Sequence, residues 1–194
     1  MIERPSLDGE GLENLIRPVS DLEISLLKLS EFRYGMLWGE PRFGHPEGKV
    51  AYHVREVLDN VAKVTLPQSD LEKLRLIALV HDTFKYEEVR TIAQGNRIHH
   101  GTLARDFVKD YTNDEELLTV IELHDEAYYC WRTIHFHDDK VAGYKRLDHL
   151  MERVEGFLPL YYAFFKCDTR TGDKIQTPVK WFEKNIKDLE LIEW

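Results

Sequence analysis

Apolar residues recur along much of the chain at the three- and four-residue spacing of amphipathic helices. The predicted helices cover 20–36, 49–64, a segment that begins at 69, 98–110, a segment that begins near 112, 140–168 and 178–190. Pro159 is expected to kink or split the longest of them, and Pro178 suits the first turn of the last. Strand-like alternation is nowhere sustained, and only 131–138 is predicted to be extended. The pattern therefore predicts an all-α protein.

Three short motifs predict where helices begin. Ser20-Asp-Leu-Glu23, Ser69-Asp-Leu-Glu72 and Thr112-Asn-Asp-Glu115 each have the form of a capping box, in which a hydroxyl accepts a hydrogen bond from a backbone N–H three residues later. The glycines and prolines between Gly39 and Gly48 predict a loop before the second helix. We therefore expect residues 1–19 to form an N-terminal extension and residues 20–194 to form a single-domain helical bundle.

Composition narrows the class of protein. The 194 residues are 43% hydrophobic, which is enough for a core, and their formal charge is -9. An extended nucleic acid is not an expected partner, because phosphate backbones bind clusters of Lys and Arg. No apolar run reaches the roughly 20 residues of a membrane span, and the first residues do not resemble a signal peptide. We therefore expect a cytoplasmic protein without a membrane partner, and a homodimer is compatible with the sequence.

Histidine and aspartate residues stand at the ends of apolar runs. His53 lies on the predicted inner face of the second helix, His81-Asp82 follows the run Leu76–Val80, and Asp168 follows Leu160–Phe165. Burying an ionised Asp costs several kcal/mol unless it is paired, and a bound metal ion would supply the partner. Any one buried His is more often a hydrogen-bonded core residue than a ligand. The joint pattern favours a metal site.

This order of residues resembles that of the HD-domain superfamily of metal-dependent phosphohydrolases, in which a His is followed by a His-Asp doublet and a distal Asp. The stretch Gly44–His53 is similar to the His-Pro-Glu-Gly lead-in of the HD domain in some tRNA nucleotidyltransferases, although the chain shows no nucleotidyltransferase head. Further similar stretches are Ala78–Lys85, His99–Arg105, Val120–His124 and Lys166–Gly172, so the resemblance spans about 44–173. It implies an all-α bundle of the HD-domain type.

Two departures leave the subfamily open. Lys85 and Tyr86 stand where stringent-response alarmone hydrolases have Glu-Asp after the doublet. The Gly-Tyr-Pro signature of cyclic-dinucleotide hydrolases is also missing from the sequence.

The resemblance implies a site with named roles. His53, His81, Asp82 and Asp168 would bind one divalent cation, which nitrogen and carboxylate ligands restrict to Mn, Fe, Co, Ni, Zn or Mg. Asp82 would also steer the attacking water. Lys85 lies one helical turn beyond His81 and is the candidate catalytic and substrate-binding cation.

Further residues extend the predicted site. His124 and either His99 or His100 would bind a second metal or the substrate phosphate. Comparison of the neighbouring small residues favours His99, with His100 nearly as good, so both stay candidates. Arg170 is a candidate phosphate ligand. Asp125 follows His124 and is either a carboxylate that orients an imidazole or a solvated charge on a helix.

Three hypotheses for function follow. The first is a metal-dependent phosphohydrolase that uses a metal-activated water to hydrolyse a small phosphate ester, a nucleotide phosphomonoester or a cyclic phosphodiester. The second is a non-catalytic HD module that binds metal and a nucleotide as a sensor or interaction domain. The third is a helical interaction protein whose histidines are structural. The sequence does not give the metal or the substrate.

Overall fold

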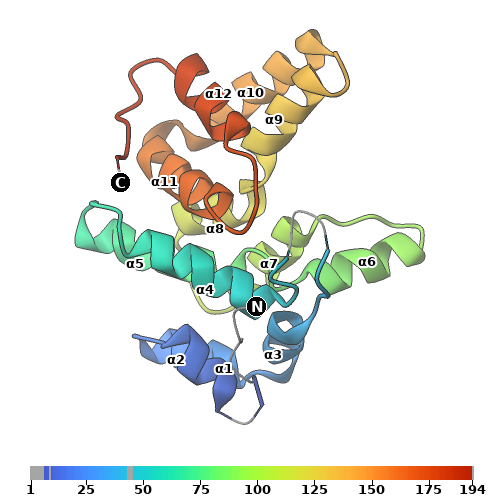
Figure 1. Ribbon diagram of the computed structural model, residues 1–194, viewed down its shortest axis with the longest axis vertical. Coiled ribbons are helices and arrows are strands. Elements are labelled where there is room, and N and C mark those ends of the chain that lie inside the picture. Colours follow the sequence, from blue (N-terminus) through green and yellow to red (C-terminus); the bar gives the residue numbers. More distant parts are fainter. Residues whose placement is uncertain (1–6, 9, 43–45, 194) are drawn as a thin grey trace.

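A computed structural model describes residues 7–8, 10–42 and 46–193, and its elements are all helices. The elements are α1 (Gly11–Ile16), α2 (Asp21–Lys28), α3 (Ser30–Leu37), α4 (Val50–Val61), α5 (Gln68–Val80), α6 (Lys85–Ala93), α7 (His100–Val108), α8 (Glu115–Leu123), α9 (Glu126–His135), α10 (Lys140–Val154), the 3-10 turn η1 (Glu155–Phe157), α11 (Leu158–Thr169) and α12 (Thr177–Asn185) (Figure 1). The all-α prediction is confirmed. None of the described helices is long and apolar enough to cross a membrane.

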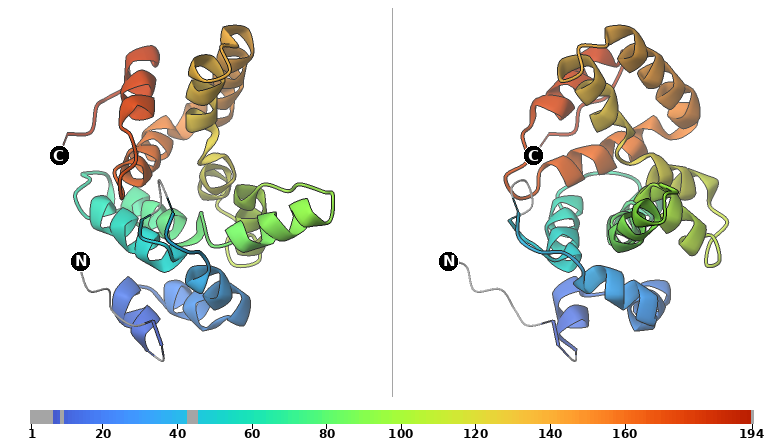
Figure 2. Two further views of the ribbon diagram at one scale, coloured as in Figure 1. Left: turned by 45° about the vertical axis from the view of Figure 1, so that its right-hand side comes forward. Right: turned by 90° about the vertical axis from the view of Figure 1, so that its right-hand side faces the viewer.

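The central helices carry the residues of interest. In Figure 1, α1–α3 lie at the lower end of the molecule and α9, α10 and α12 at the upper end. Between them α4 packs on α5 and α11, and α5 also packs on α8 and α11 (Figure 2). This packing brings the ends of α5 and α8 and the faces of α4 and α11 to one place in the interior.

Two predicted elements are wrong in form. The helix predicted over 20–36 is divided into α2 and α3 because Leu29 is extended, with φ -74° and ψ 130°. The stretch 131–138, predicted to be extended, lies largely in α9. Its buried residues recur at helical spacing once the upstream turn is included: Ala127, Cys130, Trp131 and Ile134. The prediction failed because it began at 131 and missed the first half of this period.

The capping predictions succeed at one site of three. The Ser20 hydroxyl accepts from Glu23 N, as expected. The start predicted at Ser69 is wrong, because α5 begins at Gln68 without a side-chain cap. The start predicted at Thr112 is also wrong, because the carboxylate of Asp114 accepts from Leu117 N and takes the capping position. The predicted division of 140–168 before Pro159 is confirmed, whereas the last helix ends at Asn185 rather than at 190.

Part of the predicted N-terminal extension packs into the core. Leu12 and Ile16 of α1 are fully buried, α1 packs on α4, and the Arg55 guanidinium donates to the Ile16 carbonyl at 2.9 Å. Residues 1–6 of the extension, together with Gly44 and His45 of the similarity stretch, lie outside the described residues.

Candidate metal centre

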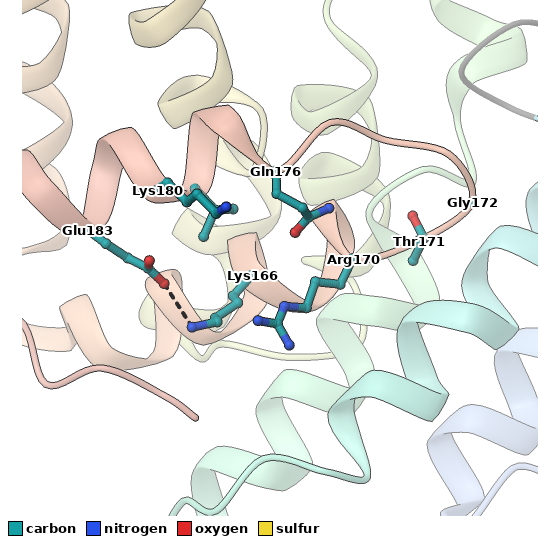
Figure 3. Close-up of a pocket in the computed structure, with 8 residues that line it drawn as sticks. Lys166, Arg170, Thr171, Gly172, Gln176, Lys180 and Glu183 are labelled. Atoms are coloured by element: carbon teal, nitrogen blue, oxygen red, sulfur yellow. Dashed lines mark hydrogen bonds and ion pairs between the residues drawn. The ribbon is translucent and has the colours of Figure 1, made fainter. Parts of the chain in front are cut away.

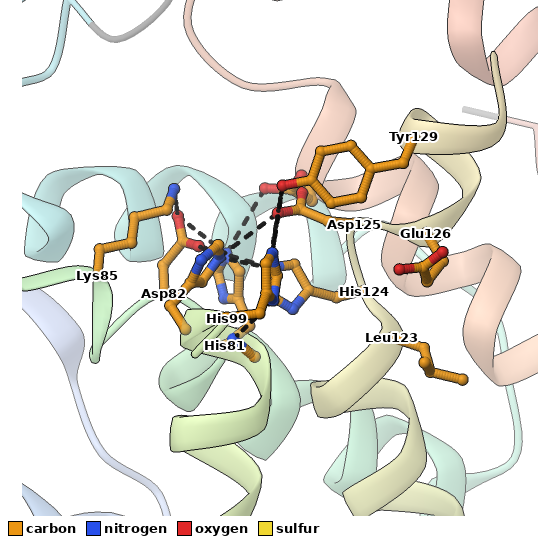
Figure 4. Close-up of polar contacts among 12 residues, drawn as sticks. His81, Asp82, Lys85, His99, Leu123, His124, Asp125, Glu126 and Tyr129 are labelled. Atoms are coloured by element: carbon orange, nitrogen blue, oxygen red, sulfur yellow. Dashed lines mark hydrogen bonds and ion pairs between the residues drawn. The ribbon is translucent and has the colours of Figure 1, made fainter. Parts of the chain in front are cut away.

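Five helices contribute the side chains of one buried cluster. His53 comes from α4, His100 from the start of α7 and Asp168 from α11. His81 and Asp82 come from the end of α5 and His124 from the end of α8 (Figure 4). The imidazoles and Asp82 are buried. Residues up to 115 positions apart in the chain therefore share one site.

A first group of candidate ligands, His53, His81, Asp82 and Asp168, lies between α4, α5 and α11. His53 Nε2 is 2.9 Å from Asp168 Oδ1 and 3.3 Å from His81 Nε2. Asp82 Oδ2 is 3.5 Å from each of these two Nε2 atoms. The ligand atoms of His53, His81 and Asp82 therefore lie within 4.8 Å of one another, and Asp168 Oδ1 lies beside two of them.

A second group, Asp82, His100 and His124, uses the other oxygen of the Asp82 carboxylate. Asp82 Oδ1 is 3.2 Å from His100 Nε2 and 3.6 Å from His124 Nε2, and these two nitrogens are 3.1 Å apart. Asp82 thus lies between the two groups, with one oxygen turned toward each.

Backbone carbonyls fix two of the rings. His81 and His124 both stand at helix C-termini, where the carbonyls of the last turn have no partner within the helix. His81 Nδ1 donates to Ala78 O at 3.0 Å, and His124 Nδ1 donates to Ile121 O at 2.8 Å. A neutral ring that donates from Nδ1 keeps a lone pair on Nε2, so each ring directs an acceptor into the cluster.

The donor set fits a divalent cation. Two Nε2 lone pairs and two carboxylates converge, and such an arrangement needs a proton or a cation between its members. His53, His81 and Asp82 could hold one ion, and Asp82, His100 and His124 could hold another. The ligands are imidazoles and carboxylates, a set that suits Zn, Mn, Fe, Co or Ni. A structural zinc site of the cysteine type would use thiolates instead.

Burial and neighbouring charges shift the pKa values of His53 and His100 in opposite directions. Burial, and then the charge of Lys174, lower the pKa of His53 to about 4, which leaves that ring neutral and able to act as a ligand. Burial alone would lower the pKa of His100, but hydrogen bonds to Asp82 and Glu88 raise it to about 9. A cation that enters the second group must therefore displace a proton from His100.

Two lysines flank the cluster. Lys85 Nζ is 2.5 Å from Asp82 Oδ2, and Lys174 Nζ is 2.9 Å from Asp168 Oδ1. Burial opposes ionisation of both carboxyls, yet Lys85 holds the pKa of Asp82, and Lys174 that of Asp168, well below the usual range. Both carboxylates are therefore ionised at neutral pH.

The structure distinguishes His99 from its neighbour. His99 Nδ1 accepts from Gly101 N at 3.1 Å and caps α7, so the N–H of the neutral ring is on Nε2, which lies 3.2 Å from the Tyr129 hydroxyl and 3.3 Å from Asp125 Oδ2. Of the two, only His100 places Nε2 beside Asp82 and His124. Asp125 Oδ2 also lies 3.5 Å from His100 Nε2, which favours the orienting role over a solvated charge.

Arg170 is placed elsewhere. Arg170 directly follows the last residue of α11 and stands two positions beyond Asp168, about 200° around a helix, so the two side chains diverge. Arg170 lines a separate pocket of about 470 Å³ between α11 and α12, together with Lys166, Lys180 and Glu183 (Figure 3). The structure therefore does not bring the predicted phosphate ligand into the cluster.

Sequence reasoning missed Lys174 and Glu88. Lys174 lies in the loop between α11 and α12, and no pattern in the sequence connects it with Asp168. Glu88 accepts from His100 Nδ1 at 2.6 Å. It follows Lys85 by three residues on α6, and helical spacing from Lys85 is the one signal that could have indicated it.

The comparisons with known proteins agree with this arrangement. The family model of the HD domain matches residues 48–130. That range includes every histidine of the cluster but not Asp168, which the fold of α11 brings to the site. Neither a curated protein nor a solved structure matches the chain.

Proposed function

Because the chain carries an HD domain, the domain of a metal-dependent phosphohydrolase family, we propose that it hydrolyses a small phosphate ester, either a nucleotide phosphomonoester or a cyclic phosphodiester. The proposed metal ligands are His53, His81, Asp82 and Asp168, with His100 and His124 for a second ion. The reaction would replace a P–O ester bond with a P–O bond from water, and the leaving oxygen would take up a proton.

One observation carries the proposal. The two oxygens of Asp82 face two different pairs of imidazole nitrogens, at 3.2 to 3.6 Å. A carboxylate that only neutralised Lys85 would need neither pair of imidazoles. This arrangement supports Asp82 as a ligand that two ions would share, and it favours a metal site over a purely structural role for the histidines.

A bound divalent metal would polarise a phosphoryl oxygen and lower the pKa of a bound water from 15.7 toward about 7. Side chains of the protein would supply the positive charge that binds the phosphate. The ammonium groups of Lys85 and Lys174 stand at the two carboxylates, where they can bind phosphoryl oxygens and stabilise the charge that develops on them. This local pair of cations would allow a chain whose formal charge is -9 to bind an anionic ester.

The test combines metal content with a substrate panel. Protein without a His tag is purified, its metals are measured by mass spectrometry, and nucleoside monophosphates, 2′,3′-cyclic nucleotides and a non-nucleotide phosphate ester are assayed before and after chelation. We expect bound divalent metal, turnover of at least one ester and loss of turnover after chelation. Metal without turnover would favour the sensor hypothesis, and protein that binds no metal would contradict both hypotheses.

Lys174 gives a prediction specific to the tertiary structure. Lys174→Gln removes one of the two cations at the site, so we expect KM for the ester to rise about tenfold, the equivalent of about 1.4 kcal/mol. The matched control is Arg170→Gln, because Arg170 lines the separate pocket. Steady-state kinetics check the result. An equal or larger rise in KM for Arg170→Gln would show that the substrate extends into that pocket.

A further inference from the structure

His100 is held differently from His81 and His124. His81 and His124 use the carbonyl three residues before them, in the last turn of a helix. His100 is the first residue of α7, so the residue three positions earlier lies in a loop and no helical carbonyl is behind the ring. A carboxylate from another helix takes this place. Glu88 Oε2 accepts from His100 Nδ1 at 2.6 Å and from His100 N at 3.2 Å.

The second oxygen of Glu88 is fixed as well. Arg97 donates to Oε1 from Nε at 3.1 Å and from Nη2 at 3.0 Å. Both oxygens of the carboxylate therefore have partners, and the side chain is 12% exposed. The hydrogen bond from His100 lowers the pKa of Glu88 to about 2, so the carboxylate is ionised at neutral pH. An ionised acceptor at this distance keeps the proton on Nδ1 and leaves Nε2 directed at Asp82 and His124.

We propose that Glu88 is a positioning residue for the second metal group, which it supports by orienting His100. This inference rests on the proposed function in one respect, that the group binds a cation. The first group has no contact with Glu88 among the described residues, so its affinity is expected to be independent of Glu88. Outer partners of this kind typically contribute 10- to 100-fold to metal affinity.

The first experiment measures metal affinity in paired variants. Metal-free full-length protein is titrated with Mn²⁺ and with Zn²⁺ by calorimetry. For Glu88→Ala we expect the weaker of two binding events to lose 10- to 100-fold in affinity while the other is unchanged. The control is Glu87→Ala, which removes the neighbouring carboxylate on the same helix and its ion pair with Arg90. Arg97→Ala removes the two hydrogen bonds that hold Glu88 Oε1 but keeps the Glu88 carboxylate, so it should give a smaller loss of metal affinity. Equal affinities in all four proteins would overturn the proposal.

A second measurement does not depend on metal. In histidine-labelled, metal-free protein, the Nδ1–H proton of His100 should give a strongly hydrogen-bonded NMR resonance that exchanges slowly with water. We expect this resonance to disappear in Glu88→Ala and to persist in Glu87→Ala, with unchanged far-UV circular dichroism in both. Its persistence in Glu88→Ala would contradict the positioning role even if both metals bind. If wild-type protein binds no metal, the proposed function fails, and this measurement alone decides whether Glu88 orients His100.

Discussion

Asp82→Asn is expected to abolish measurable turnover and to lower the metal content of both groups at once. Each oxygen of Asp82 faces a different pair of histidines, and among the described residues Asp82 is the one member common to the His53–His81 group and the His100–His124 group. The amide keeps the shape of the side chain but replaces one oxygen with NH₂ and removes the charge. We expect kcat/KM to fall more than about 100-fold, because loss of an outer partner alone costs about 10- to 100-fold.

The control for Asp82→Asn is Asp110→Asn, which makes the same chemical change at an exposed position after α7. Metal content by mass spectrometry and steady-state kinetics are measured on the three proteins. The variant also leaves Lys85 without its ionised partner, so a thermal scan must accompany the assay. Loss of metal from one group alone would show that Asp82 does not bridge, and unchanged turnover in a folded variant would overturn the site assignment.

The largest effect on stability is expected for Gly35→Ala. A Cβ on Gly35 of α3 would lie 1.9 Å from the Thr83 carbonyl oxygen, far inside any real contact, and a backbone atom cannot move aside as a flexible side chain can. The helix must shift as a whole. We expect the free energy of unfolding to fall by roughly 3 kcal/mol or more, which is the upper end of overpacking effects. For a chain of this size that is a Tm about 6–12 °C lower.

Gly156→Ala is the matched control, because a Cβ there meets no atom within 4 Å and Gly156 does not have a positive φ. Its Tm should stay the same or rise slightly, since alanine lowers the entropy of the unfolded chain. Differential scanning calorimetry checks both variants. Thr83 directly follows Asp82, so Gly35→Ala should also weaken metal binding at temperatures where it is still folded. A Tm within 1–2 °C of wild type, less than about 1 kcal/mol, would mean that α3 relaxes without cost.

The sequence predicted features whose physical cause is local. Helical periodicity is set by residues within one or two turns, so most helices were found from the apolar pattern. Two exceptions have a weak local signal: α6 has few apolar positions, with only Thr91 buried, and Leu29 breaks a pattern that continues through it. The helices α1 and α9 were also not predicted, α9 because the extended stretch was begun at 131. Caps failed where two candidate acceptors compete, as Thr112 and Asp114 do.

The first metal group could also be proposed from the sequence, because a charged residue that closes a buried apolar run must find a partner. His81-Asp82 and Asp168 carry that signal without any knowledge of the fold, whereas Asp125, which follows His124 in a second doublet, was left open.

Only the tertiary structure decided how these residues meet. The His99 ring caps α7, whereas the His100 ring lies beside His124. The two residues are neighbours in the chain, so sequence spacing could not distinguish them. Helix packing places Glu88 beside His100, and the loop after α11 places Lys174 beside Asp168. Arg170 lines a separate pocket because its side chain diverges from that of Asp168. The sequence by itself determined which side chains need a cation or a counter-charge, since burial cost depends on residue type. The packing of α4, α5, α7, α8 and α11 determined which partner each one has, because that depends on contacts between residues far apart in the chain.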